Sequence, residues 1–152
     1  MPGSRGAAVS LFQDPAALAR TIVESGPDAV IVTDSAGIIR TWNRAAERMF
    51  GYPASEALGQ SLDIIIPENL RERHWQGYRE VMRTGRSRYG EGDVLAVPGL
   101  RKDGRRISLE FTIVPLREGG RMCGMAAVLR DVTARFEELR RLRRQLADHA
   151  AG

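Results

Sequence analysis

The chain has 152 residues, 43% of them hydrophobic and 28% charged, a length and composition that fit one globular domain with flanking segments. No run approaches the roughly 18 apolar residues of a membrane span, and the first ten residues lack the apolar core of a signal peptide, so we expect a cytoplasmic protein without a membrane partner. The net charge of +4 would suit nucleic acid, but the basic residues are nearly all arginine and are interspersed with 19 acidic residues rather than clustered, so we expect no nucleic-acid partner.

The N-terminal part of the chain predicts a flexible segment followed by a helix. Residues 1–13 have no periodicity, which is typical of a frayed terminus. Asp14 is a capping carboxylate and Pro15 suits a first helical turn, whereas Gly26, which precedes another proline, stops a helix. We therefore predict a capping helix over residues 14–26.

A β-hairpin and two short helices are predicted next. Residues 29–42 hold two β-branched runs joined by a turn at residues 34–37. Asn43 suits the N-cap of the following helix, and Gly51 suits the left-handed conformation that ends it. A second helical turn should cover residues 54–58.

The next helix should begin at Pro67, end at Gly85 and carry one of the two histidines of the chain. At 3.6 residues per turn, its apolar stripe consists of Leu70, His74, Gly77, Tyr78, Val81 and Met82. The imidazole of His74 is therefore expected to face the interior, and Gly77, one turn later, is expected to leave space beside it.

The second half of the chain predicts three strands. They should cover residues 88–97, 106–115 and 122–132, with turns at residues 103–104 and 118–120 between them. Apolar and polar residues alternate along the middle strand, as in a sheet with one wet face. With two strands, then helices, then three strands, the chain predicts an α+β fold in which helices cover one face of an antiparallel sheet.

Residues 134–152 predict an amphipathic signalling and dimerisation helix. Its large apolar residues form a narrow seam, Phe136, Leu139, Leu142 and Leu146. A helix this short is marginal alone in water, so it needs a partner surface. That surface is either the protein's own domain or a second copy of the chain in a homodimer.

Three segments, arriving in this order, resemble the PAS (S-box) family of sensory and interaction modules. They are PDAVIVTDSAGIIRTWNRAAERMFGYPASEALGQSLDIIIP, RKDGRRISLEFTIVPL and GMAAVLRDVT, and the resemblance covers residues 20–133. It implies a PAS domain over residues 27–133, with a five-stranded antiparallel sheet and helices that enclose a cavity against one face. It also implies that the C-terminal helix passes the signal.

The segment IPENLRERHWQGY resembles the haem-binding members of that family, among them the oxygen-sensing histidine kinases of rhizobia. In those proteins a histidine on the long helix ligates the haem iron, and His74 stands at that position. The resemblance thus implies a b-type haem, held non-covalently because the chain has no Cys-x-x-Cys-His run. The signal it implies is a diatomic gas or the redox state of the iron.

The resemblance also implies which residues surround such a haem. They are Gly77, Tyr78, Leu109, Phe111, Met122 and Met125 around the porphyrin, with Arg86, Arg88 and Tyr89 for its propionates. A methionine can be an axial ligand, but Met122 and Met125 are more simply core filler, and alternation along one strand should place them on opposite faces. Leu95 stands where the oxygen-sensing kinases have an arginine, and residues 88–97 include no Met, His or Cys for a sixth ligand.

Other functions are either excluded or left open by the sequence. The flavin photoreceptor branch of the family needs a reactive cysteine before the long helix, where this chain has GQSLDIII, so that branch is excluded. A non-covalent flavin, FAD or FMN, or a small metabolite leaves no such signature and stays open. A haem-free module for protein interaction and dimerisation also stays open.

Catalysis has no residues to support it. No nucleophile elbow, phosphate-binding loop or zinc-protease motif is present, so we expect no enzyme. The single cysteine, Cys123, and the two histidines exclude an internal disulfide and clustered metal sites, which leaves a lone imidazole for a cofactor that brings its own metal ligands. We expect the signal to be received by a separate signalling protein or by the second copy of the chain.

Overall fold

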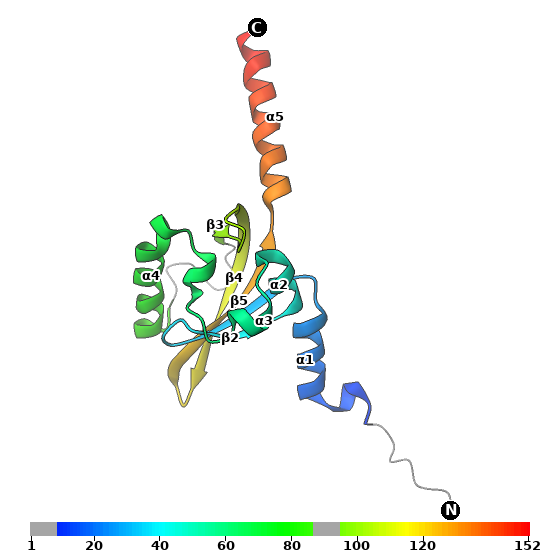
Figure 1. Ribbon diagram of the computed structural model, residues 1–152, viewed down its shortest axis with the longest axis vertical. Helices are drawn as coiled ribbons and strands as arrows, with labels where there is room; N and C mark the ends of the chain where they lie inside the picture. The colour runs from blue at the N-terminus through cyan, green and yellow to red at the C-terminus, as the bar shows by residue number, and fades with distance from the viewer. Residues whose placement is uncertain (1–8, 87–94) are drawn as a thin grey trace, which may run out of the picture.

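A five-stranded antiparallel sheet lies at the centre of the computed structural model, which describes residues 9–86 and 95–152. Its strands are β1 (Ala29–Asp34), β2 (Ile39–Trp42), β3 (Leu95–Leu100), β4 (Arg106–Glu118) and β5 (Arg121–Asp131). They are ordered β2-β1-β5-β4-β3, so the first and last strands of the chain pair in the middle of the sheet (Figure 1).

The helices of the described residues are α1 (Pro15–Ser25), α2 (Arg44–Phe50), α3 (Ala54–Ala57), α4 (Arg71–Thr84) and α5 (Thr133–Ala151). The helices α2, α3 and α4 come between β2 and β3, whereas α5 projects away from the sheet and α1 lies toward the opposite end of the molecule (Figure 1). In the part of the chain that is described, none of these helices has the length and hydropathy needed to cross a membrane.

The helix ends are set by the residues that the sequence singled out. The side chains of Asp14 and Asn43 each accept a hydrogen bond from a backbone N–H in the first turn, at the starts of α1 and α2. Gly51 and Gly85 follow α2 and α4 with φ values of 81° and 69°, a left-handed conformation that favours glycine. The predicted capping of these helices is confirmed.

The predicted α+β fold is confirmed, but α4 begins later than expected. Pro67 is followed by a 3-10 turn, Glu68–Leu70, and the α-helix starts only at Arg71. Pro67 is the N-cap residue of this 3-10 turn, where its missing N–H removes no hydrogen bond of the turn. His74 consequently lies one turn from the start of α4.

Two strand ends also differ from the prediction. β4 continues to Glu118, past the expected residue 115, because Gly119 and Gly120 adopt positive φ and form a two-residue turn that pairs Glu118 with Arg121. β3 continues to Leu100, past the expected residue 97, because Leu100 still pairs with Arg106 on β4; the part of the predicted strand before Leu95 lies outside the described residues.

Among the residues that the structure describes, the buried apolar side chains form two separate clusters. The larger joins the sheet to α2 and α3, and its buried members are Ala29, Ile31, Ile39, Trp42, Ala45, Ala46, Phe50, Ala57, Ile65, Ile107, Leu109 and Leu129. The smaller, here called the α4 cluster, consists of Tyr78, Val81 and Met125, with Trp75, Met82, Ile113 and Met122 packed against it. α4 is thus held to the sheet by its own small set of contacts.

The strand β5 passes directly into α5 at a junction fixed to β4. The backbone N–H of Val132 donates to the Ser108 carbonyl at 2.8 Å, and Thr133 Oγ1 accepts from the Ser108 N–H at 2.9 Å. Arg130, just before the junction, pairs with Asp28 at 3.0 Å. Beyond the junction α5 has no buried residue.

Candidate functional site

His74 lies near the start of α4 and is half-buried. Its Nδ1 atom is buried and has no hydrogen-bond partner among the described residues. Burial lowers the pKa of the imidazole below its usual 6.5, and the carboxylate of Asp63 acts in the opposite direction. The ring is therefore neutral near pH 7, which is the form that binds a metal.

Trp75 packs against the ring of His74 and against the β1–β2 turn. The centroids of the His74 and Trp75 rings are 4.7 Å apart, in an edge-on arrangement. The Nε1 atom of Trp75 donates to Asp63 Oδ1 at 2.7 Å. The indole covers Gly37 so closely that a Cβ there would lie 2.2 Å from the ring, so this turn position requires glycine. The turn and α4 thereby hold each other in place.

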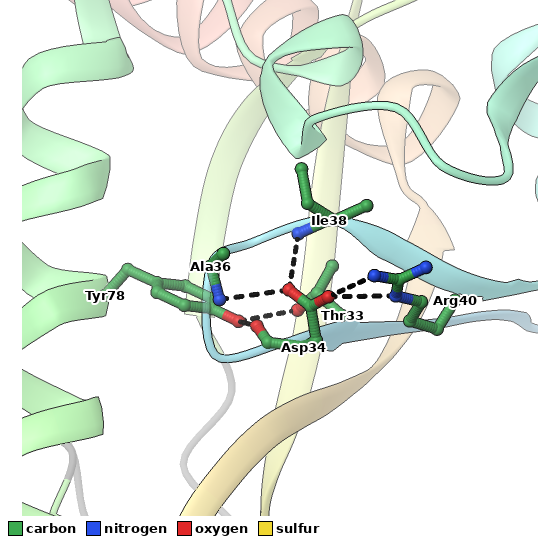
Figure 2. Close-up of polar contacts among 6 residues, drawn as sticks. All are labelled: Thr33, Asp34, Ala36, Ile38, Arg40 and Tyr78. Carbon is green, nitrogen blue, oxygen red and sulfur yellow. Dashed lines mark hydrogen bonds and ion pairs between the residues drawn. The ribbon is translucent and has the colours of Figure 1, made fainter.

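Tyr78 joins α4 to the end of β1 (Figure 2). Its side chain is 5% exposed, and its hydroxyl oxygen lies 2.9 Å from Thr33 Oγ1. The same hydroxyl donates to the carbonyl oxygen of Asp34. Burial raises the pKa of Tyr78, although the hydrogen bond with Thr33 opposes this, so the hydroxyl stays protonated and can donate at neutral pH.

Asp34 fixes the turn to which Tyr78 is bonded (Figure 2). Its Oδ1 atom accepts from the backbone N–H groups of Ala36 and Ile38, both at 3.0 Å, and its Oδ2 atom pairs with Arg40 at 2.8 Å. Burial acts to raise the pKa of Asp34, but these hydrogen bonds and the Arg40 charge together outweigh it and lower the pKa. The carboxylate is therefore ionised at neutral pH and keeps the turn ordered.

The prediction that Met122 and Met125 lie on opposite faces of the sheet is wrong. Met125 is buried in the α4 cluster, and Met122 packs against the same cluster. The register between β4 and β5 skips Cys123, which is the extra residue of a β-bulge. One inserted residue resets the alternation of side chains, so both thioethers reach the same side.

The buried face of α4 is rotated from the one that the helical wheel predicted. Gly77 is exposed, and a Cβ there would meet nothing within 4 Å, so its expected place in the buried stripe is wrong. The most buried residue of the helix is Tyr78, which stands about 100° around the helix from Gly77. Trp75, which the wheel left outside the stripe, packs against the α4 cluster beside Met82, on the flank of the helix away from Gly77.

The remaining predicted site residues do not all gather at His74. Leu109 is buried in the larger cluster and Phe111 packs against that cluster, while Leu95 pairs with Phe111 at the start of β3. Arg86 is exposed just after α4. Two residues expected near the propionates lie outside the described residues, Arg88 and Tyr89.

Three residues of this region were not predicted from the sequence. Thr33 had a signal, because it occupies an inward position of β1 after Ala29 and Ile31 and is the one polar residue of that alternating set. Trp75 also had one, since it precedes Tyr78 by three residues and thus shares its face. Asp63 belongs to a 3-10 turn before α4, and no feature of the sequence indicates that it lies beside Trp75.

The chemistry that this arrangement offers is a single neutral imidazole beside an apolar, aromatic cluster. Among residues 9–86 and 95–152, no three His, Cys, Asp or Glu side chains come together as a metal site would require. His74 is therefore suited to be one ligand of a metal whose other ligands belong to a cofactor, rather than part of a site built by the protein alone.

Curated proteins similar to this chain are signalling proteins. "Sensor protein FixL" of Bradyrhizobium diazoefficiens is 36% identical over 126 residues, which are 79% of this chain and 25% of that protein. "Oxygen sensor protein DosP" of Escherichia coli is 30% identical over 117 residues, which are 75% of this chain and 14% of that protein. The chain thus spans a quarter or less of the length of these relatives.

Solved structures similar to this chain agree on the fold. The PAS domain of a protein from Colwellia psychrerythraea has a TM-score of 0.69 at 24% identity, over 80% of this chain and 99% of that one. An RNA-binding Light-Oxygen-Voltage receptor has a TM-score of 0.68 at 27% identity, over 97% of this chain and 40% of that one. The family profile described as the PAS fold matches residues 17–132, and with the sheet order and the helices described above, this shows that the chain belongs to the PAS family.

Proposed function

We propose that this PAS domain is a sensor module that binds b-type haem through His74 and reports a diatomic gas or the redox state of the iron. The observation that carries the proposal is the buried Nδ1 atom of a neutral imidazole on α4, which has no hydrogen-bond partner in the described part of the chain. A buried polar atom without a partner costs about 1 to 3 kcal/mol, so a bound group that engages and reorients this ring removes a cost that the ligand-free protein carries. The similarity to an oxygen sensor protein supports the same function.

The residues of the chain fit the donor chemistry of a haem. His74 would supply an imidazole nitrogen for the iron, Met122 and Met125 would form an apolar wall on one side of the sheet, and Arg86 would offer a cation at the end of α4 for a propionate. When bound, the haem would supply an iron centre that takes up a diatomic gas or changes its redox state.

A haem beside His74 would need the space that the side chains of the α4 cluster occupy. Tyr78, Val81 and Met125 fill the region between α4 and β5, and four further side chains pack against them. Because the larger cluster does not include α4, this helix can move without disrupting the main core. The proposal therefore requires a displacement of α4 or of its side chains on binding.

The proposal is tested by titrating the purified protein with hemin and recording the visible spectrum. We expect a sharp Soret band in the wild type and its loss in His74→Ala, with circular dichroism showing that the variant remains folded. The matched control is His149→Ala, which removes the other histidine of the chain, at an exposed position on α5, and should keep the band. A wild-type spectrum with no Soret band, or a band that His74→Ala leaves unchanged, contradicts the proposal.

A second candidate function is that of an interaction module for a second copy of the chain. It is favoured by the exposed seam of α5, where Phe136, Leu139, Leu142 and Leu146 are 48%, 48%, 42% and 71% exposed. Large apolar side chains that recur on one helix face are typical of a helix–helix interface. This function does not need haem, and it is also the means by which a haem sensor would pass on its signal.

A non-covalent flavin, FAD or FMN, is the alternative cofactor. The likeness to a Light-Oxygen-Voltage receptor supports a search for it. The one cysteine of the chain, Cys123, lies on β5, whereas the photoreceptor branch of the family carries its reactive cysteine before the long helix. A flavin absorbance band in the purified protein, with no change on hemin addition, would favour this alternative over haem.

A further inference from the structure

The hydroxyl of Tyr78 makes a buried polar contact between the middle of α4 and the sheet, and its hydrogen bonds have a defined direction (Figure 2). At the end of α4, Arg117 on β4 also donates to the carbonyl oxygen of Gly85. A tyrosine hydroxyl has one proton, and the carbonyl oxygen of Asp34 can only accept, so Tyr78 donates to Asp34. Its oxygen then accepts from Thr33, whose Oγ1 atom is 2.9 Å away. The hydroxyl proton of Thr33 is therefore donated to Tyr78, a residue of α4.

A second hydrogen-bond acceptor lies near the hydroxyl group of Thr33. The carbonyl oxygen of Met125, on β5, lies 3.5 Å from Thr33 Oγ1. That distance is at the long end for a hydrogen bond of a hydroxyl group, so the bond at 2.9 Å to Tyr78 is the better one while Tyr78 is present. Once Tyr78 leaves, a buried hydroxyl would lose its partner, and the Met125 carbonyl is the group that can replace it.

We propose that Tyr78 and Thr33 form a two-position latch. In the closed position Thr33 donates to Tyr78 and α4 is held against β1. In the open position Tyr78 has left, α4 is released, and Thr33 donates to the carbonyl oxygen of Met125 on β5.

The surroundings of the two residues suit a device with two positions. Thr33 is 4% exposed, and its strand approaches β5 so closely that a Cβ on Gly124 would lie 2.1 Å from the Thr33 carbonyl oxygen. The sheet side of the latch is therefore rigid. The α4 side is not part of the larger cluster, so its contacts can break while the main core stays intact.

The latch depends on the proposed function only for the identity of the group that opens it. Tyr78 follows His74 by one helical turn, with ring centroids 6.0 Å apart, and its ring fills the α4 cluster. A porphyrin beside His74 needs that space, so binding and the closed latch exclude each other. The open position changes a hydrogen bond on β5, the strand that leads into α5.

The latch is tested without haem by amide hydrogen exchange and nuclear magnetic resonance on the full chain. Tyr78→Phe removes the hydroxyl and keeps the ring, so it breaks two hydrogen bonds, with Asp34 and with Thr33, and exchange within α4 should become about tenfold faster or more. Thr33→Val breaks only the second of these bonds, so its effect should be smaller, about fivefold. The double variant should exchange no faster than Tyr78→Phe, because the Thr33 bond to α4 is already lost there. Thr33→Ser, which restores a hydroxyl, should return exchange to the wild-type rate.

The open position has its own readout at the amide nitrogen of Ala126, which shares a peptide unit with the Met125 carbonyl. Its resonance should shift in Tyr78→Phe, where Thr33 turns to Met125, and should return toward its wild-type position in the double variant with Thr33→Val. An equal shift in the single and the double variant, or unchanged exchange in α4, would overturn the latch. Should Tyr78→Phe not fold, the Thr33→Val and Thr33→Ser pair still decides on the closed position, because exchange in α4 that is unchanged in Thr33→Val overturns the latch.

The test separates the latch from the cofactor. Hemin should bind to Tyr78→Phe about fivefold more tightly than to the wild type, because binding no longer has to open a closed state. If the wild type binds no hemin, the proposed function fails while the exchange result still decides on the latch. If the wild type binds hemin and Tyr78→Phe changes neither exchange nor affinity, the latch fails and the proposed function stands.

Discussion

Two polar side chains, Asn43 and His74, lie inside the protein but differ in whether their hydrogen-bonding atoms have partners. Asn43 is fully buried, and all of its hydrogen-bonding capacity toward the described residues is used by backbone partners. His74 is half-buried and its Nδ1 atom has no partner there. Buried polar atoms are nearly always paired. The other unpaired buried side-chain atom of the described residues, Arg101 Nε, lies 3.7 Å from the carboxylate of Asp103, whereas His74 Nδ1 has no such neighbour, so His74 is the position at which a function is to be expected.

The stability of the protein should depend on pH through His74. Burial holds its folded-state pKa below the usual 6.5, so between these two values the unfolded state binds the additional proton. The stabilisation is therefore present above pH 6.5 and is lost as the pH falls toward the folded-state pKa, at up to about 1.4 kcal/mol per pH unit. His74→Gln should lose less stability than the wild type on acidification, in urea denaturation at pH 7.5 and pH 5.5.

The carboxylates of the chain titrate in both proteins, so only the difference between them reports on His74. His149→Gln is the control, because it removes a histidine whose side chain is exposed on α5 and should retain the wild-type pH dependence. Equal pH dependence in the wild type and His74→Gln would show that the imidazole is not buried as described.

At the scale of elements, Asn43 ties three segments together. Its Oδ1 atom accepts from the N–H groups of Val30, on β1, and of Ala46, on α2, at 2.9 and 3.0 Å. Its Nδ2 atom donates to the carbonyl oxygens of Val23, on α1, at 2.7 Å, and of Asp28, at 3.0 Å. The sequence identifies the N-cap of α2, but not the contacts to α1 and β1, because these partners are distant in the chain.

Asn43→Ala should destabilise the protein by about 3 kcal/mol, since it removes four hydrogen bonds and leaves their buried backbone partners unpaired. Asn43→Ser is the matched variant, because a serine hydroxyl at the N-cap can still accept from the Ala46 N–H and brings no buried charge. Its cost in chemical denaturation should lie between that of alanine and zero. A cost below about 1 kcal/mol for Asn43→Ala would mean that water replaces the side chain.

How far the elements could be predicted depends on whether their signals are local. Caps and turns such as Gly51, Gly85 and the glycines after β4 have local signals, and the predicted elements there are confirmed. The bulge at Cys123 and the rotation of α4 toward Tyr78 depend on partners far away in the chain, so alternation and the helical wheel misplaced Met122 and Gly77. The apolar pattern gave the helix but not the angle at which it packs.

At the scale of the whole molecule, the sheet domain and α5 are two parts joined at one junction. The junction is fixed, with Val132 and Thr133 bonded to Ser108, and an ion pair joins Arg135 to Glu110. Past it, α5 extends away from the sheet with no buried side chain (Figure 1). Because β5 runs into α5 at this junction, the proposed signal would pass along α5 to a partner that covers the exposed seam.

A second copy of the chain covering that seam should make the protein a dimer whose association depends on concentration. Leu139→Glu and Leu142→Glu place charges at the centre of the seam and should shift sedimentation toward the monomer, since each buried leucine contributes about 1.5 to 3 kcal/mol before the cost of association. Gln145→Glu adds the same charge outside the seam and should leave the dimer intact. The seam is under two heptads long, so the wild-type dimer should be weak and should dissociate on dilution. A wild type that is monomeric at every concentration, or leucine variants that remain dimeric, would assign the seam to a different signalling partner.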